Sequence, residues 1–216
     1  MADDDKDKDT LIQGLRRSKI ELDLAYDATI EGFARALDLR EREPAGHTHQ
    51  VTEYTLRLAK ALAIPEPELV QIKRGALLHD IGKMGIPEHI LQKTEPLTDE
   101  EWNIICKHPQ YAYDLLAPII YLYPAIDIPY CHHEKWDGTG YPRGLKHEQI
   151  PRAARIFVVV DVWDALTTDR PYRKAWTNDK AIQFIHEQAG LYFDPDVVKV
   201  FLNMDFKKSL TRPYVK

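Results

Sequence analysis

The sequence predicts an all-α protein, and three observations support this fold class. Apolar residues recur at helical spacing through most of the 216-residue chain. Proline and glycine fall between these segments, where helices end. One Val-rich segment fits a strand or a helix, but no other segment offers it a partner strand. Hydrophobic residues make up 44% of the chain and charged residues 29%, so the chain can bury a core of globular type.

The N-terminal part divides into a short tail and a long helix. Residues 1–9 (MADDDKDKD) are charged and poor in apolar side chains, so we expect them to be disordered or to have been added by cloning. Residues 10–40 form a predicted connector helix with two seven-residue repeats, namely Leu15, Leu22 and Thr29, and Lys19, Tyr26 and Phe33, the latter continued by Leu37. This helix either packs on its own domain or pairs with a second copy and leads to a sensor module upstream. The seam is short for a coiled coil, so both interpretations stay open.

The remaining helices follow from apolar spacing and from start and stop residues. We predict them at residues 48–63, 67–78, 98–107, 108–116, 155–166, 178–190 and 194–204. The segment 155–166 (RIFVVVDVWDAL) is the Val-rich one, and its twelve residues without Gly or Pro favour a helix. Residues 84–97 are a candidate lid, because Gly85, Pro87 and Pro96 interrupt regular structure there.

Composition excludes several classes of function. The net charge of −5 argues against binding duplex nucleic acid by bulk electrostatics. No apolar run reaches the length of a membrane span, and no secretory segment follows the start. The cysteines Cys106 and Cys131 are too few for a disulfide framework, which predicts reduced thiols and a cytoplasmic protein.

The dipeptide His79-Asp80 is the first candidate site, because it ends an apolar helical stretch, GALLHDIGK. Burial of an imidazole and a carboxylate is costly unless they are paired or bound to metal. Neighbouring side chains on a helix diverge by about 100°, so this pair would suit two adjacent metal ions. Lys83 lies one turn later on the same side.

Further histidines and carboxylates extend this set to eight candidate metal ligands: Glu43, His47, His79, Asp80, His108, His132, His133 and Asp161. A single structural zinc ion uses about four ligands, whereas eight fit two or three six-coordinate ions that still hold water. Imidazoles and carboxylates without thiolates indicate iron, manganese or zinc. Two such ions could share a hydroxide and clamp a phosphoryl group, with Lys83 holding an oxygen of a phosphodiester.

Some polar residues and two loops are ranked lower. His49, His89, His147 and His186 lie in polar contexts and are not expected to bind metal. Asp164 is either a partner of a ligand or a core hydrogen-bonding group. The stretch 133–144 (HEKWDGTGYPRG) allows a close backbone approach and presents Tyr141, or it is an ordinary surface loop. The arginines Arg170 and Arg173 either bind a phosphate as a fork or are solvated.

Together these motifs closely resemble the HD-GYP family of cyclic di-GMP phosphodiesterases. The motifs are HTHQV, LLHDIGKMGIP, KHPQYA, HHEKWDGTGYPRGL and VVVDVWDALTTDRPYRKA, in this order, and the match covers roughly residues 40–205. The resemblance implies the HD helical-bundle fold, with a catalytic domain at 41–206 and a tail at 207–216. It also implies that the eight candidates are ligands of two or three divalent ions, most of all iron and alternatively manganese, with Glu43 belonging to three-metal members.

The resemblance also implies the reaction and the roles of residues around it. Asp80 and Lys83 would act in catalysis, and Lys83, Tyr141, Arg170 and Arg173 would contact cyclic di-GMP, which is opened to pGpG and then cut more slowly to GMP. The family commonly has Gly where Ala112 stands, a mild change. Two alternatives remain: a module that binds the nucleotide without cleaving it, and an HD phosphohydrolase for cyclic GMP-AMP.

Overall fold

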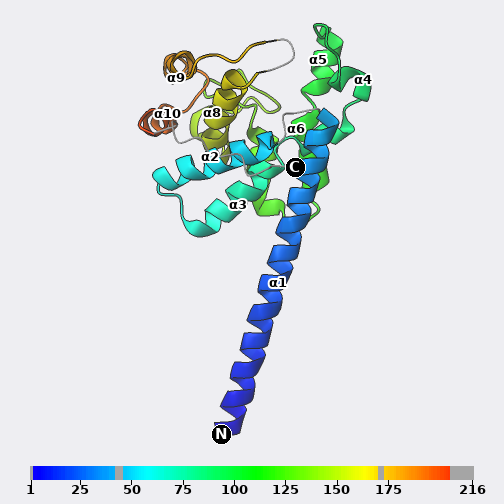
Figure 1. The fold of residues 1–216 in the computed structure, drawn as a ribbon, viewed down its shortest axis with the longest axis vertical. Helices are drawn as coiled ribbons and strands as arrows, with labels where there is room; N and C mark the ends of the chain where they lie inside the picture. The colour runs from blue at the N-terminus through cyan, green and yellow to red at the C-terminus, as the bar shows by residue number, and fades with distance from the viewer. Residues whose placement is uncertain (1, 42–45, 170–172, 205–216) are drawn as a thin grey trace.

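The computed structural model describes residues 2–41, 46–169 and 173–204 and confirms the all-α prediction (Figure 1). No β-strand forms within these ranges, and an isolated bridge joins Ala189 to Phe193. The helices are α1 (Ala2–Glu41), α2 (His47–Ala61), α3 (Glu66–Leu77), η1 (Ile81–Gly85), α4 (Glu88–Leu91), α5 (Asp99–Ile105), α6 (His108–Leu116), η2 (Tyr123–Ala125), α7 (Asp127–Cys131), η3 (His147–Gln149), α8 (Arg152–Thr167), α9 (Asn178–Glu187) and α10 (Pro195–Leu202).

Helix α1 is longer than predicted, because it begins at Ala2 and not at Thr10. The expectation of a disordered segment is therefore corrected for residues 2–9. No proline interrupts this stretch and no glycine precedes Gly14, and each residue added to an existing helix gains a hydrogen bond without a new nucleation step.

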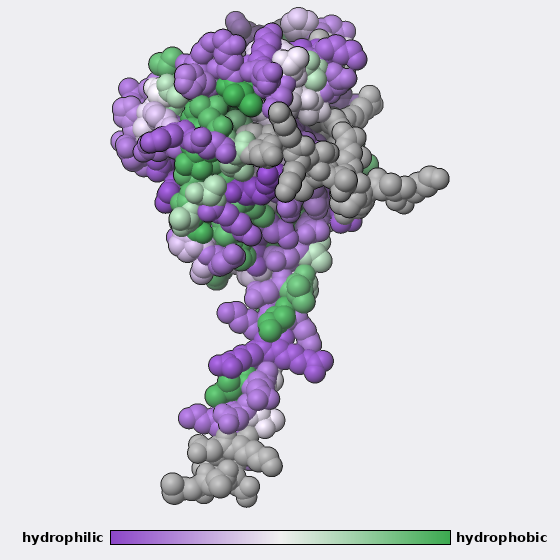
Figure 2. All heavy atoms as spheres, turned by 60° about the vertical axis from the view of Figure 1, so that its left-hand side comes forward, coloured by the Kyte–Doolittle hydropathy of each residue, from purple (hydrophilic) through white to green (hydrophobic). Residues whose placement is uncertain are grey.

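The C-terminal part of α1 packs on the domain from Asp23 onward, while its first part projects as a stalk (Figure 1). Ile30, Ala34 and Leu37 are buried there. Along the projecting part, apolar side chains appear as separate groups on a largely hydrophilic surface (Figure 2). The C-terminal end of α1 thus packs on its own domain, as the first interpretation requires. Its projecting part leaves open the second interpretation, in which α1 pairs with a second copy.

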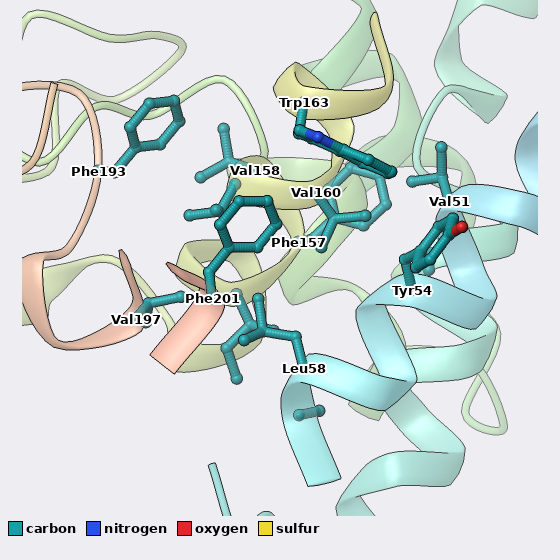
Figure 3. Close-up of a cluster of buried hydrophobic side chains, with 14 of the residues drawn as sticks. Val51, Tyr54, Leu58, Phe157, Val158, Val160, Trp163, Phe193, Val197 and Phe201 are labelled. Carbon is teal, nitrogen blue, oxygen red and sulfur yellow. The ribbon is translucent and has the colours of Figure 1, made fainter. Parts of the chain in front are cut away.

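The main core surrounds α8, which packs against α2, α7, α9 and α10. Phe157 and Val160 of α8 meet Leu58 of α2 and Phe201 of α10 (Figure 3). Because α8 is covered on nearly all sides, its sequence is apolar without a polar stripe, which explains the resemblance to a buried strand. The prediction of a helix here is confirmed.

A second cluster joins the end of α3 to α6 and to α1. Gly82 of η1 lies so close to α6 that a Cβ atom would stand 1.8 Å from the carbonyl oxygen of His108. Only glycine permits this approach. The short elements η1, α4, η2, α7 and η3 were not predicted from the sequence.

Helices α4 and α5 lie together at one end of the domain (Figure 1). The candidate lid at 84–97 is anchored by the buried Ile86 and Ile90. Thr98 starts α5 with a capping box, in which its hydroxyl accepts from the Glu101 amide and the Glu101 carboxylate accepts from the Thr98 amide. In the part of the chain that the structure describes, no helix is both long and apolar enough to cross a membrane.

Candidate metal centre

Four of the predicted ligands converge at one point. Asp80, His108, His132 and His133 each offer a ligand atom, and these atoms all lie within 4.8 Å of one another. Asp80 lies in the turn between α3 and η1, His108 is the first residue of α6, and the histidine pair follows α7. The fold therefore brings together residues that are more than fifty positions apart.

Local structure orients three of the histidines in the same way. Each follows the end of a helix, where the last-turn carbonyl groups have no partner within the helix. The Nδ1 atom of His79 donates to the carbonyl of Ala76 at 2.8 Å, and that of His108 to Ile105 at 2.8 Å. His132 donates likewise to Ile128 at 3.0 Å. A neutral ring held in this way carries its lone pair on Nε2, the atom that can bind metal.

The polar atoms of the cluster do not satisfy one another, and a bound cation would satisfy them. The Nε2 atoms of His108 and His132 are 3.2 Å apart, so two lone pairs face one another. The Oδ1 atom of Asp80 is buried without a hydrogen-bond partner among the described residues, and it lies 3.4 Å and 3.6 Å from the same two nitrogens. A buried unpaired carboxylate oxygen is costly, and a divalent ion would satisfy it together with both imidazoles.

The other Asp80 oxygen is fully engaged. Oδ2 accepts from Lys83 Nζ at 2.7 Å and lies 3.0 Å from His79 Nε2. The sequence predicted that His79 and Asp80 diverge as neighbouring side chains on a helix do. This prediction is corrected, because α3 ends at Leu77 and both residues lie in the turn that follows. The chain leaves the helix because Gly82 has to approach α6, and the resulting turn lets both side chains converge.

Burial and neighbouring charge set the protonation of the cluster. Burial lowers the pKa of His108 to about 3, in spite of Asp80, and His132 adds to the effect. Burial and the rings of His132 and His108 hold the pKa of His133 well below its usual value. Both rings are therefore neutral near pH 7 and able to bind metal.

Asp80 and His79 behave as an ion pair. Burial alone would raise the pKa of Asp80, but Lys83 and His79 hold it well below its usual value. Burial alone would lower the pKa of His79, but Asp80 raises it to about 9. A metal ion at His79 would have to displace this proton.

His47 and Asp161 lie on α2 and α8, which pack against each other. His47 Nδ1 donates to Asp164 Oδ2 at 2.8 Å, and Gln50 donates to the other oxygen of Asp164 at 2.8 Å. Asp164 is buried on α8, one turn after Asp161. The charge of Asp161 acts on His79, so Asp161 borders the cluster without belonging to the four atoms that meet directly. Asp164 is thus a buried hydrogen-bonding partner of His47, which is compatible with both roles expected for it.

The loop at 133–144 is folded onto the cluster. A Cβ atom on Gly140 would lie 2.4 Å from the Lys135 amide nitrogen, so only glycine allows the loop to close. The buried Glu134 carboxylate accepts from the amides of Arg143 and Leu145 at 2.8 Å and 3.0 Å. The Tyr141 ring then stacks on His133 with centroids 4.7 Å apart.

The hydroxyl of Tyr141 is held by a residue that the sequence did not single out. It donates to Cys106, and burial followed by this contact raises the pKa of Tyr141. Gln50 and Trp102, which borders Tyr141, were also missed. These contacts join residues far apart in sequence, and no local pattern marks them.

The remaining predicted residues are placed as follows. Glu43 and Arg170 lie outside the described residues. Arg173 donates to the carbonyl groups of Ala165 and Leu166 at the end of α8 and lies over the Trp176 ring. Away from the cluster, His49 approaches Glu31 and His147 packs on Trp136.

The fold and the site define a helical domain that gathers histidine and aspartate side chains into a candidate metal centre. A family model described as HD domain matches residues 31–197, and the chain belongs to this family. The resemblance to its HD-GYP members is confirmed by relatives and by structural neighbours.

Relatives of known name are similar over most of the chain. The cyclic di-GMP phosphodiesterase response regulator RpfG of Xanthomonas campestris is 37% identical over 89% of this chain and 52% of its own length. A 3'3'-cGAMP-specific phosphodiesterase of Vibrio cholerae is 36% identical over 83% of this chain and 39% of its own. The chain thus spans about half, or less, of the length of these relatives.

A solved HDGYP protein of Bdellovibrio bacteriovorus shares the fold. Its TM-score is 0.60 at 22% identity, and the match covers 73% of this chain and 50% of that one.

Proposed function

We propose that this domain hydrolyses cyclic di-GMP to linear pGpG, with a slower second cut to GMP, using two or three divalent metal ions. The observation that carries the proposal is the converging set of Asp80, His108, His132 and His133, with one Asp80 oxygen buried and unpaired. Relatives named cyclic di-GMP phosphodiesterases, 36–41% identical, support the choice of substrate.

The four clustered residues would hold the first ions, with His79, His47, Asp161 and, from sequence alone, Glu43 completing the set. Bound ions would stabilise the developing charge on the phosphoryl oxygens and lower the pKa of a water molecule. Lys83, which donates a hydrogen bond to Asp80, would hold a nonbridging phosphate oxygen. Tyr141 lines the site through its ring, and Arg170 and Arg173 remain candidates for contacts with the dinucleotide.

Removal of the central carboxylate tests the proposal. Purified protein loaded with iron or manganese should release pGpG from cyclic di-GMP, and Asp80→Asn should abolish turnover. Asp179→Asn is the matched control, because it removes an exposed carboxylate from the first turn of α9. Chromatography of the nucleotides reads out both products. A metal-loaded protein that binds cyclic di-GMP and never cleaves it would be a binding module and not an enzyme.

Cyclic GMP-AMP is a second candidate substrate. Three relatives of Vibrio cholerae named 3'3'-cGAMP-specific phosphodiesterases are 36%, 37% and 31% identical to this chain. The first two values overlap those of relatives named for cyclic di-GMP, at 36–41%. A panel of both cyclic dinucleotides on one preparation decides between them, with kcat/KM as the measure. We expect the larger value for cyclic di-GMP.

Iron is the proposed metal, with manganese as the alternative, because the family resemblance implies them. The imidazoles and the carboxylate of the cluster, without a thiolate, agree with either ion. Elemental analysis of protein purified without oxygen should find two or three ions per chain. Zinc at one ion per chain would contradict this part of the proposal.

We also propose that α1 pairs in parallel with α1 of a second copy and leads to an upstream sensor or receiver module in the cytoplasm. Leu15 and Leu22 share one face of α1 and are 62% and 53% exposed. A single projecting helix is only marginally stable in water, and pairing would cover this face. The double variant Leu15→Glu/Leu22→Glu should shift the protein to monomers in analytical ultracentrifugation. Leu24→Glu, which alters an equally exposed leucine on another face, should not.

A further inference from the structure

We propose that Trp102 of α5 is the stacking platform for a guanine base of the substrate, a role that rests on the proposed function. Its indole ring would lie against one base while the phosphodiester sits at the histidine cluster. The proposal assigns base binding to α5, for which the sequence predicted a helix and no function.

Trp102 is connected to the cluster by a chain of rings. Its centroid lies 6.4 Å from that of Tyr141, with the planes at 80°. Tyr141 stacks on His133 and also lies 6.4 Å from the His108 ring. Tyr141 therefore contacts both the candidate ligand His133 and Trp102, so the indole is one ring removed from the cluster.

The packing of α5 does not explain a tryptophan at this position. None of the side chains of α5 is buried, and Trp102 is 50% exposed. A large apolar ring left half in water beside a polar site is typical of a binding surface.

The helix nevertheless holds Trp102 in place. The capping box at Thr98 fixes the start of α5, and the Glu101 carboxylate also pairs with Lys93. Cys106, just after the helix, accepts from the Tyr141 hydroxyl. The platform is thus organised before substrate arrives, which reduces the entropy lost on binding.

The apolar indole ring of Trp102 favours a nucleobase as its binding partner. An indole offers an extended π surface, and a nucleobase stacks on it with either face. A cyclic dinucleotide carries two bases on one ring, so a base can reach the indole while the phosphate stays with the ligands. Phosphate or sugar would gain little from an apolar ring.

The test separates base binding from cleavage by using two substrates. Trp102→Ala should raise the KM for cyclic di-GMP about tenfold, whereas Trp102→Phe should retain most of the affinity. With an abasic analogue of the same cyclic dinucleotide, which keeps both phosphodiesters and lacks both bases, the two variants should match the wild type. Tyr123→Ala, which removes another exposed aromatic ring, is the control and should leave both substrates unchanged. Circular dichroism verifies that each variant folds.

Each outcome has one meaning. An unchanged KM for cyclic di-GMP in Trp102→Ala overturns the platform. An equal loss on both substrates also overturns it, because Trp102 would then merely position Tyr141. A wild-type protein that binds no cyclic dinucleotide at all would instead refute the proposed function.

Discussion

At the residue scale, the site depends on side chains that fix other side chains. His79, His108 and His132 are oriented by carbonyl groups at helix ends, and His47 is oriented by Asp164. The candidate ligands were predictable, because histidine and aspartate stand out in apolar segments. The contacts of Gln50 with Asp164 and of Cys106 with Tyr141 were not predictable, since they depend on long-range packing.

Asp164→Ala should weaken metal binding by about 10–100-fold, because His47 loses the carboxylate that fixes its tautomer and orientation. Gln50→Ala removes only the second contact of Asp164 and should have a smaller effect. Competition with a coloured chelator measures both affinities. Equal affinity in Asp164→Ala and wild type would show that His47 does not bind the ion.

Gly82→Ala should destabilise the domain by about 3 kcal/mol or more, since the added Cβ would overlap the His108 carbonyl in a tightly packed contact. Gly32→Ala is the matched control, because a Cβ there meets nothing within 4 Å. It lies within α1 and should be stabilising by up to about 1 kcal/mol. Denaturant unfolding gives both free energies. A similar stability for the two variants would contradict the close approach of η1 and α6.

At the element scale, helices of seven residues or more were predicted within a few residues, apart from the start of α1, and the shorter ones were missed. Helix α6 has the predicted bounds, 108–116, because His108-Pro109 marks its start. Helix α7 and η1 have too few residues for a periodic pattern, yet α7 directly precedes His132 and η1 directly follows Asp80. The docked end of α1 also contacts η1, where Arg40 donates to the carbonyl groups of Lys83 at 3.2 Å and Ile86 at 2.8 Å.

The docking of α1 should depend on one partly buried ion pair. Asp27 accepts from the buried Arg74 at 2.8 Å, so Asp27→Ala leaves an uncompensated charge and should cost about 3 kcal/mol. Glu31→Ala removes more exposed pairs of the same helix, with Lys73 and His49, and should cost less than about 1 kcal/mol. Urea unfolding of both variants provides the comparison. If Glu31→Ala were the more damaging change, the junction would not be centred on Arg74.

At the scale of the whole molecule, the sequence patterns could not predict how the helices are arranged in space. The heptad-like repeat of α1 gave two interpretations, and the structure shows that the same helix packs at one end and projects at the other (Figure 1). The convergence of Asp80 with His108 and the His132–His133 pair likewise depends on how α3, α6 and α7 pack together. Family resemblance anticipated this convergence, while periodicity and spacing alone could not.

Because its ligands come from three separate segments, a bound ion should link the elements of the fold and stabilise the whole domain. An ion at 100 times its Kd adds about 2.7 kcal/mol to the free energy of unfolding. For a chain of this size that corresponds to a rise in Tm of roughly 5–10 °C.

Scanning calorimetry with and without EDTA, followed by addition of manganese, measures the shift. Asp80→Asn should abolish it, because the buried carboxylate shared by the cluster loses its charge, whereas Asp179→Asn should retain it in full. If manganese raised the Tm of Asp80→Asn as much as that of the wild type, the stabilising ion would bind elsewhere. The unpaired Asp80 oxygen among the four clustered side chains would then need an explanation other than metal binding.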